Sequence, residues 1–385
     1  MGWCGRDSQA GFAAIERRYY EISVQSFSSN LALYYDAVFR RAYRPVALDY
    51  CSVAAGNTYL RVSAISKLKL NHTMNIEQLN TAHGITGQLK FVEGGGGFPF
   101  IQIDNAKASA VISVYAGQVL SFQPANEPHN LLFLSEAAYY QAGKAIKGGV
   151  PICWPWFGPD PERLGRPAHG FVRNRLWNVI QTEVKAGDTK VTLGLTDTPE
   201  TRAIWPHSFA LALEITVGDS LNLELVTRNM GNEAFSITQA FHTYFKVGYI
   251  GEVVVLGLEN ANYIDKVDNG AHKRQKGAVT INAEVDRIYR DAPNELVIDD
   301  TALDRRIRIA SQGSKTAVVW NPWEKISAEM GDLKDDDYEY LLFVETANAD
   351  THVVEVGPDG ESRLVANYRV EQYLPDVLDR LRGLF

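Results

Sequence analysis

Residues 209–229 read FALALEITVGDSLNLELVTRN, and this stretch indicates the kind of fold. Leucines occupy every second position from Leu221 to Leu225, with Asn222 and Glu224 between them. In an extended chain, successive side chains point to opposite faces, so a pattern that repeats every second residue leaves one face that can be buried. The Gly-Asp-Ser sequence at 218–220 is a turn signal. The stretch therefore predicts two strands separated by a turn.

The same alternation recurs along the chain from Met74 onward, for example at residues 305–309. Further expected strands cover residues 110–115, 119–123, 190–195, 253–256, 316–320, 341–346 and 353–356. Helical patterns are few, and the best of them covers residues 371–384. Many short strands without alternating helices predict an all-β fold, a large antiparallel β-sandwich with few short helices.

Composition narrows the class of protein. The 385 residues are 45% hydrophobic and carry a net charge of −8, which argues against a nucleic-acid-binding surface. The three cysteines, Cys4, Cys51 and Cys153, are odd in number and widely spaced. They indicate neither a disulfide framework nor a zinc site and fit a reducing compartment, so cytoplasm is the expected location. Because no run of 18 or more residues is apolar, we expect no membrane span.

The first 73 residues differ from the rest in charge. They carry a net charge of +4, whereas residues 74–385 carry −12. Their arginines, serines and few acids are similar to a transit peptide, but a lineage-specific extension or a mistaken start fits equally well. We place a boundary at Met74, between an extension at 1–73 without assigned function and a catalytic domain at 74–385.

Residues 148–159, GGVPICWPWFGP, form a segment too rich in proline for a helix or a central strand. His169 and Arg173 follow it. Rigid prolines and aromatic faces beside a histidine and an arginine suit a ring-shaped, hydroxylated or anionic ligand. A surface loop with buried anchoring aromatics remains the alternative interpretation.

Two residues stand out as proton carriers. His242 lies within the sequence TQAFHTYF at 238–245, and Glu345 ends the apolar run at 340–344. Partial burial raises the pKa of a carboxyl group toward the range of a general base, and histidine exchanges protons near neutrality. A core histidine and a solvated strand-end glutamate are the alternatives, and the sequence leaves open whether the two residues meet. No histidine stands in a metal-ligand pattern, so no metal is expected.

Three blocks of residues 74–385 together resemble the glucose-6-phosphate 1-epimerases, or hexose-6-phosphate mutarotases, of the galactose-mutarotase-like superfamily. The blocks are 147–159 with 169–177, then 238–247, then 319–330 with 343–348. The resemblance implies a single β-supersandwich with its sugar site on the concave face of one sheet. It also implies an isomerase that interconverts the anomers of a hexose 6-phosphate without metal or organic cofactor.

The resemblance also implies roles for individual residues. Glu345 is the base that takes the proton from O1, and His242 is the acid toward the ring oxygen. His169 binds a sugar hydroxyl. Further candidates for hydroxyl groups are Asp265 and Gln123, although a turn aspartate and a strand-end polar residue explain them as well. Trp154 and Phe157 are candidates for an apolar face against the ring, or for the core.

The 6-phosphate requires cations or clustered N–H donors. Arg173 is the first candidate, because a guanidinium binds two phosphate oxygens at once. Lys147 is the second, at a point where family members commonly carry arginine. A surface ion pair is the alternative for Arg173, and the acidic run at 332–337 is predicted to be a solvated turn.

Three functions remain open at this point. The first is a hexose-6-phosphate anomerase, the second an aldose 1-epimerase acting on unphosphorylated hexoses, and the third a non-catalytic regulatory protein that binds sugar phosphates. In each case the expected partner is a small molecule, with neither nucleic acid nor membrane, and the expected state is a monomer.

Overall fold

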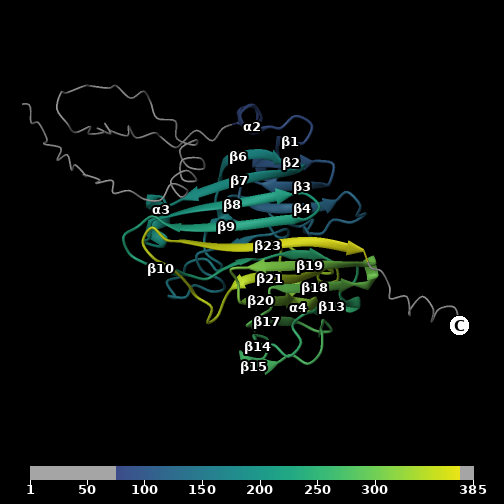
Figure 1. Ribbon diagram of the computed structural model, residues 1–385. Coiled ribbons are helices and arrows are strands. Elements are labelled where there is room, and N and C mark those ends of the chain that lie inside the picture. Colours follow the sequence, from purple (N-terminus) through teal and green to yellow (C-terminus); the bar gives the residue numbers. More distant parts are fainter. Residues whose placement is uncertain (1–74, 373–385) are drawn as a thin grey trace, which may run out of the picture. The chain divides into compact units, whose positions relative to one another are not determined.

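The computed structural model describes residues 75–372 (Figure 1). The expected boundary between residues 73 and 74 lies outside the described residues. So does most of the expected C-terminal helix, whose first two residues end a strand instead.

A nine-stranded antiparallel sheet forms one layer, in the order β16–β13–β18–β19–β23–β9–β8–β7–β6. Its strands are β6 Asn178–Lys185, β7 Asp188–Thr196, β8 Phe209–Val217, β9 Leu221–Asn229, β13 Val253–Leu256, β16 Val279–Thr280, β18 Glu295–Asp300, β19 Arg305–Gln312 and β23 Glu361–Gln372.

An eight-stranded antiparallel sheet has the order β15–β14–β17–β20–β21–β11–β5, and β12 also pairs with β21. Its strands are β5 Ile152–Cys153, β11 Gln239–Phe241, β12 Tyr244–Lys246, β14 Asn262–Asp265, β15 Ala271–Arg274, β17 Val285–Arg290, β20 Thr316–Asn321 and β21 Leu341–Asn348.

Two smaller sheets and several short helices complete the described part. The four-stranded sheet contains β1 Leu89–Glu93, β2 Pro99–Asp104, β3 Ala108–Ser113 and β4 Gln118–Pro124, and a two-stranded sheet pairs β10 Phe235–Ile237 with β22 Val354–Val356. The α-helices are α2 Ile76–His83, α3 Pro199–Ile204 and α4 Trp323–Glu329. The 3-10 turns are η1 Gly95–Gly97, η2 Val172–Asn174, η3 Ile250–Glu252, η4 Thr301–Leu303 and η5 Asp337–Glu339.

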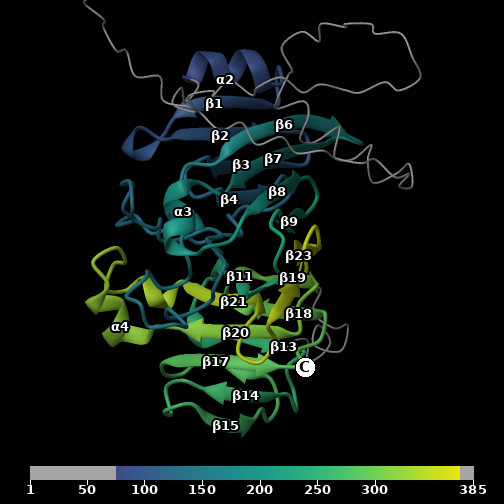
Figure 2. The same ribbon diagram turned by 90° about the vertical axis from the view of Figure 1, so that its left-hand side faces the viewer.

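The sheets pack as a sandwich. The four-stranded sheet lies beside β6–β8, and the eight-stranded sheet lies beside β13 and β18 (Figure 2). One continuous cluster of buried apolar side chains joins all four sheets. The expected all-β sandwich with few short helices is therefore confirmed.

The stretch at 209–229 forms the β8–β9 hairpin, with Phe209 paired to Asn229 and Val217 paired to Leu221. Leu223 is buried in the core, whereas Asn222 on the opposite face of β9 is partly exposed. The alternation in the sequence thus marks the core face of the nine-stranded sheet.

We expect Leu223→Ala to lower the free energy of unfolding by about 2–5 kcal/mol, because it opens a cavity in the core. Met230→Ala changes an exposed side chain just after the same hairpin. It should cost less than about 1 kcal/mol. Urea unfolding followed by tryptophan fluorescence measures both values, and equal losses would contradict this assignment of the core.

Candidate active site

Strand pairing brings His242 and Glu345 together. β11 and β12 both pair with β21, with Phe241 opposite Thr346 and Tyr244 opposite Phe343. This shared register sets His242 opposite Glu345, and side chains of directly opposed residues lie on the same face of a sheet. His242 Nε2 lies 3.6 Å from Glu345 Oε1.

Burial dominates the electrostatics of this pair. The two residues are 7% and 2% exposed. Burial, reinforced by the charge of Asp286, raises the pKa of Glu345 well above its usual value. Burial, reinforced by nearby positive charge, lowers the pKa of His242 well below its usual value. Because the mutual attraction of carboxylate and imidazolium opposes both shifts, the pair is expected to titrate as a unit.

Both members of the pair retain unused hydrogen-bonding capacity. Glu345 Oε2 and His242 Nδ1 are buried without a hydrogen-bond partner among the described residues. Buried polar atoms are normally paired, so such atoms require a specific explanation. Both atoms are therefore available to a bound ligand.

Aromatic side chains surround His242. The ring of Tyr244 stacks at a centroid distance of 5.5 Å, and the rings of Phe343 and Trp320 meet the imidazole edge-on at 5.1 and 5.9 Å. Phe343 lies opposite Trp320, and Trp320 lies opposite Asp286. This row of side chains continues the face of the sheet that carries Glu345.

Asp286 is a site residue that sequence reasoning missed. It lies on the same face as Glu345 and pairs with Lys266, whose Nζ is 2.8 Å from Asp286 Oδ2. Its charge raises the pKa of Glu345, while the charge of Lys266 lowers it. Asp286 lies within β17 and Lys266 directly follows β14, and no local sequence pattern marks either residue. Only the pairing of the strands places them near Glu345.

His169 also reaches this face. Its imidazole ring lies 5.3 Å from that of His242. The backbone N–H of Gly158 donates to His169 Nδ1 at 3.3 Å, and the Cys153 sulfur lies 3.3 Å from the same nitrogen. Burial, with the charges of Arg173, Lys266 and Lys147, lowers the pKa of His169 to about 3. A neutral ring that accepts at Nδ1 carries its proton on Nε2, so His169 is a hydrogen-bond donor.

A pocket of about 270 Å³ adjoins the pair and is rich in cations. It is lined by Tyr139, Lys144, Ala145, Ile146, Lys147, Pro151, Arg173, Tyr244 and Asp332. The carbonyl of Pro151 accepts a hydrogen bond from the backbone N–H of His242, and the ring of Tyr244 stacks on the imidazole. The pocket therefore shares a wall with the His242–Glu345 pair.

The two cations expected from the sequence line this pocket together. Arg173 Nη2 donates to the carbonyl of Ala168, and its Nε is buried without a partner among the described residues. Lys147 Nζ lies 3.5 Å from Asp332 Oδ1. Burial, together with the charge of Arg173, lowers the pKa of Lys147, and Asp332 opposes the shift.

Lys144 and Asp332 are pocket residues that sequence analysis did not identify. Lys144 lies in an exposed loop without a periodic pattern. The run at 332–337 was predicted to be a solvated turn, but Asp332 lines the pocket and Asp337 is buried.

The structure does not bring Asp265 and Gln123 to this site. Asp265 lies on the face of the eight-stranded sheet opposite to that of Glu345, and it pairs with Lys273 Nζ at 2.8 Å. Gln123 belongs to β4 of the four-stranded sheet, where its amide donates to the carbonyl of Glu127. Asp265 therefore fits better as a turn aspartate, and Gln123 fits better as a polar residue near the end of a strand.

Of the two aromatic candidates, only Phe157 lies on the site face. Its ring packs edge-on against His169 at 5.1 Å. Trp154 is fully buried in the core, and its indole N–H donates to the Thr227 hydroxyl at 3.1 Å. Neighbouring side chains of an extended segment point to opposite sides, so Cys153 faces the site and Trp154 does not.

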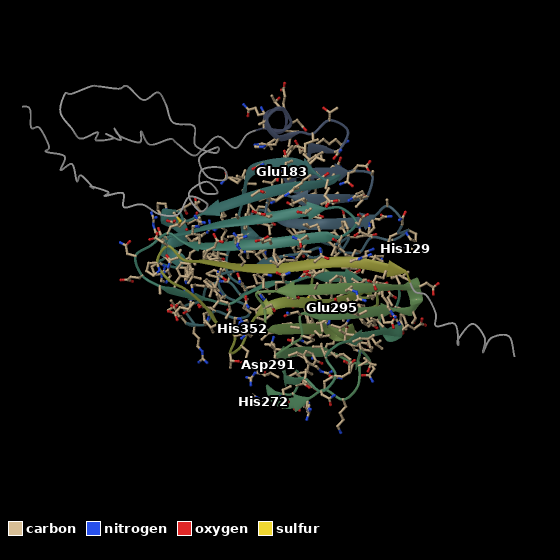
Figure 3. The ribbon with its side chains drawn as sticks, viewed as in Figure 1. His129, Glu183, His272, Asp291, Glu295 and His352 are labelled. Carbon is tan, nitrogen blue, oxygen red and sulfur yellow. The ribbon has the colours of Figure 1, made fainter. Side chains whose placement is uncertain are left out.

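Three further histidines lie at separate places in the structure. His129, His272 and His352 lie far apart from one another (Figure 3). Within residues 75–372, no group of three or more His, Cys, Asp or Glu residues is arranged to hold a metal ion. No helix in the described part is long and apolar enough to span a membrane.

We expect Glu345→Gln to stabilise the protein at alkaline pH more than at acidic pH. Because the pKa of Glu345 is raised in the folded state, its contribution to stability is present below the ordinary pKa and is lost as pH rises. A glutamine side chain does not ionise, so the variant does not lose this stability as pH rises. Urea unfolding of both proteins at pH 5 and pH 8 tests this, and a stability difference that is independent of pH would contradict it.

Comparison with known proteins assigns the chain to a family. The sequence model of the family described as Aldose 1-epimerase matches residues 99–369. An Escherichia coli (strain K12) protein named "Putative glucose-6-phosphate 1-epimerase" is 36% identical over 271 residues, which cover 70% of this chain and 90% of that protein.

Two solved structures share the fold. The crystal structure of "a putative mutarotase (YeaD)" from Salmonella typhimurium has a TM-score of 0.71 at 32% identity and covers 75% of this chain and 96% of that one. A galactose mutarotase-like protein from Clostridium acetobutylicum has a TM-score of 0.56 at 14% identity, over 74% of this chain and 98% of that one. The resemblance seen in the three sequence blocks is thereby confirmed: the chain belongs to the aldose 1-epimerase family.

Proposed function

We propose that this protein interconverts the α and β anomers of hexose 6-phosphates, glucose 6-phosphate among them, by acid/base opening and reclosure of the ring. The observation that carries the proposal is the buried His242–Glu345 pair beside a pocket that contains three cations. The name of the Escherichia coli relative supports the same substrate.

Ring opening requires two proton transfers. Glu345 takes the proton from the O1 hydroxyl while His242 gives a proton to the ring oxygen, and the bond between C1 and the ring oxygen breaks. The product is the open aldehyde, with a new hydroxyl group where the ring oxygen was. Rotation about the C1–C2 bond and reclosure from the other face, with both transfers reversed, gives the other anomer. The protons balance over the cycle because the pair returns to its starting state.

The desolvated pair suits this chemistry. A general acid and a general base are most effective when their pKa values lie near the working pH. Burial raises the pKa of Glu345 from its usual value toward the working pH, which suits a general base. Burial lowers the pKa of His242, so the carboxylate of Glu345 must stabilise the protonated imidazole that acts as the acid. His169, fixed as a hydrogen-bond donor, and Asp286, an acceptor, lie at positions suited to bind sugar hydroxyl groups.

The adjoining pocket suits a phosphate group. Arg173, Lys147 and Lys144 supply three positive charges against the single carboxylate of Asp332. Arg173 has no ion-pair partner among the described residues, which leaves its guanidinium available to two phosphate oxygens. A phosphate group in this pocket would hold the sugar ring beside His242.

We expect Glu345→Gln and His242→Asn each to slow the anomerisation of glucose 6-phosphate by roughly 10²–10⁴-fold. Each variant removes one of the two proton carriers. NMR exchange spectroscopy between the α and β signals measures the rate directly.

Asp265→Asn is the matched control, because Asp265 is a carboxylate on the other face of the same sheet. It should keep the rate within about threefold of wild type, because Asp265 pairs with Lys273 and does not face His242 or Glu345. Full exchange by the Glu345 and His242 variants would rule out this mechanism. Binding of the sugar phosphate by the wild type without any acceleration would favour a regulatory protein.

We expect Arg173→Met to raise the KM for glucose 6-phosphate by about 10–100-fold, as for loss of a charged hydrogen-bond donor. The value of kcat/KM for free glucose should fall much less. Arg175→Met is the control, since Arg175 pairs with Glu200 and does not line the pocket. If Arg173→Met lowered kcat/KM equally for glucose 6-phosphate and free glucose, the result would favour an aldose 1-epimerase without a phosphate site.

A further inference from the structure

Residues 141–148 form an irregular loop that carries two of the three cations of the pocket. Lys144 and Lys147 both line the pocket, but the loop belongs to no helix or strand. An irregular segment has few backbone hydrogen bonds of its own to fix its path. The position of the two ammonium groups therefore depends on what holds the loop from outside.

Gln118 holds the loop on both sides of Lys147. It is the first residue of β4 and is fully buried. Its Nε2 donates to the carbonyl of Ile146 at 3.1 Å and to the carbonyl of Gly148 at 2.6 Å. A side-chain amide has two N–H donors, so one glutamine satisfies both carbonyls that flank Lys147.

Tyr115 holds the loop at Lys144. Its hydroxyl donates to the carbonyl of Lys144 at 2.7 Å, and the carbonyl of Gln141 lies 3.2 Å away. The ring of Tyr115 is buried and stacks on Phe98 at a centroid distance of 4.1 Å. The hydroxyl group is thus presented to the loop by a side chain that is itself fixed.

Backbone contacts leave the loop little freedom next to these anchors. Gly148 forms an isolated bridge with Leu134, and the N–H of Gly149 donates to the carbonyl of Phe133 at 2.7 Å. At both glycines φ is positive, and an added Cβ would lie within 2.5 Å of backbone atoms. Lys147 therefore projects from a segment that is tied on either side.

We propose that Tyr115 and Gln118 are positioning residues for the phosphate subsite, which hold Lys144 and Lys147 where their ammonium groups meet the 6-phosphate of the substrate. This inference rests on the proposed function. Neither residue lines the pocket, so each acts through the loop. Loss of either anchor leaves a carbonyl without its donor and lets the cations move away from the phosphate. Ring opening at His242 and Glu345 is unaffected, because those residues lie on other strands.

The test compares Gln118→Met, which keeps the length of the side chain, with Tyr115→Phe, which removes only a hydroxyl group. Gln123→Met is the matched control, since Gln123 lies on the same strand but donates to the carbonyl of Glu127. NMR exchange rates at several sugar concentrations give kcat and KM for glucose 6-phosphate, and kcat/KM for free glucose. All proteins are full-length chains.

We expect Gln118→Met to raise the KM for glucose 6-phosphate by about 5–20-fold and Tyr115→Phe by about threefold. The kcat of both variants, their kcat/KM for glucose and all values of Gln123→Met should stay within about twofold of wild type. In a Lys147→Met background, Gln118→Met should add less than about twofold, because residues that act through one another are not additive.

Three results would overturn the inference. One is an unchanged KM in both anchor variants, and another is an equal loss of kcat on both sugars, which indicates a merely structural role. The third is a full effect of Gln118→Met in the Lys147→Met background. Failure of the proposed function is distinguishable, because Lys147→Met and Arg173→Met would then leave the KM for glucose 6-phosphate unchanged.

Discussion

The removal of one carboxyl group and one imidazole from water is the constraint on which the rest of this site depends. Glu345 and His242 lie opposite each other on adjoining strands, 3.6 Å apart. Burial disfavours the charged form of each group, and the mutual attraction of carboxylate and imidazolium opposes this effect. The surrounding aromatic rings of Tyr244, Trp320 and Phe343 exclude water from the pair.

The two parts of the site are built differently. The acid/base pair stands on paired strands of the eight-stranded sheet, where the register fixes the separation of the groups. Lys144 and Lys147 stand on a loop, which side chains of the β3–β4 hairpin hold through hydrogen bonds. Paired strands fix the positions of side chains closely, which proton transfer requires. A phosphate group has several oxygens and therefore tolerates more variation in the positions of its donors. The division matches what each step demands of its geometry.

The sequence predicted the fold and singled out His242 and Glu345, which the structure brings together, but it did not show which of the other candidates share their face. The strand at Leu221–Leu225 was predictable because burial of one face leaves a local alternation. All eight residues of β21 are buried, so no such pattern distinguishes the face of Glu345 from that of Val344. A difference of one position therefore decides the face. Asp265 points away from the site and its neighbour Lys266 toward it, and Trp154 and Cys153 differ in the same way. The pairing of β11 and β12 with β21 joins residues about a hundred positions apart, which no local pattern specifies.

A crystal structure of the full-length Glu345→Gln variant with glucose 6-phosphate bound would test the central claim most directly. The account predicts that O1 lies within about 3 Å of the side chain at position 345 and the ring oxygen within about 3 Å of His242. The phosphate group should lie among Lys144, Lys147 and Arg173. A sugar whose C1 lies away from the pair, or a phosphate group bound outside this pocket, would contradict it.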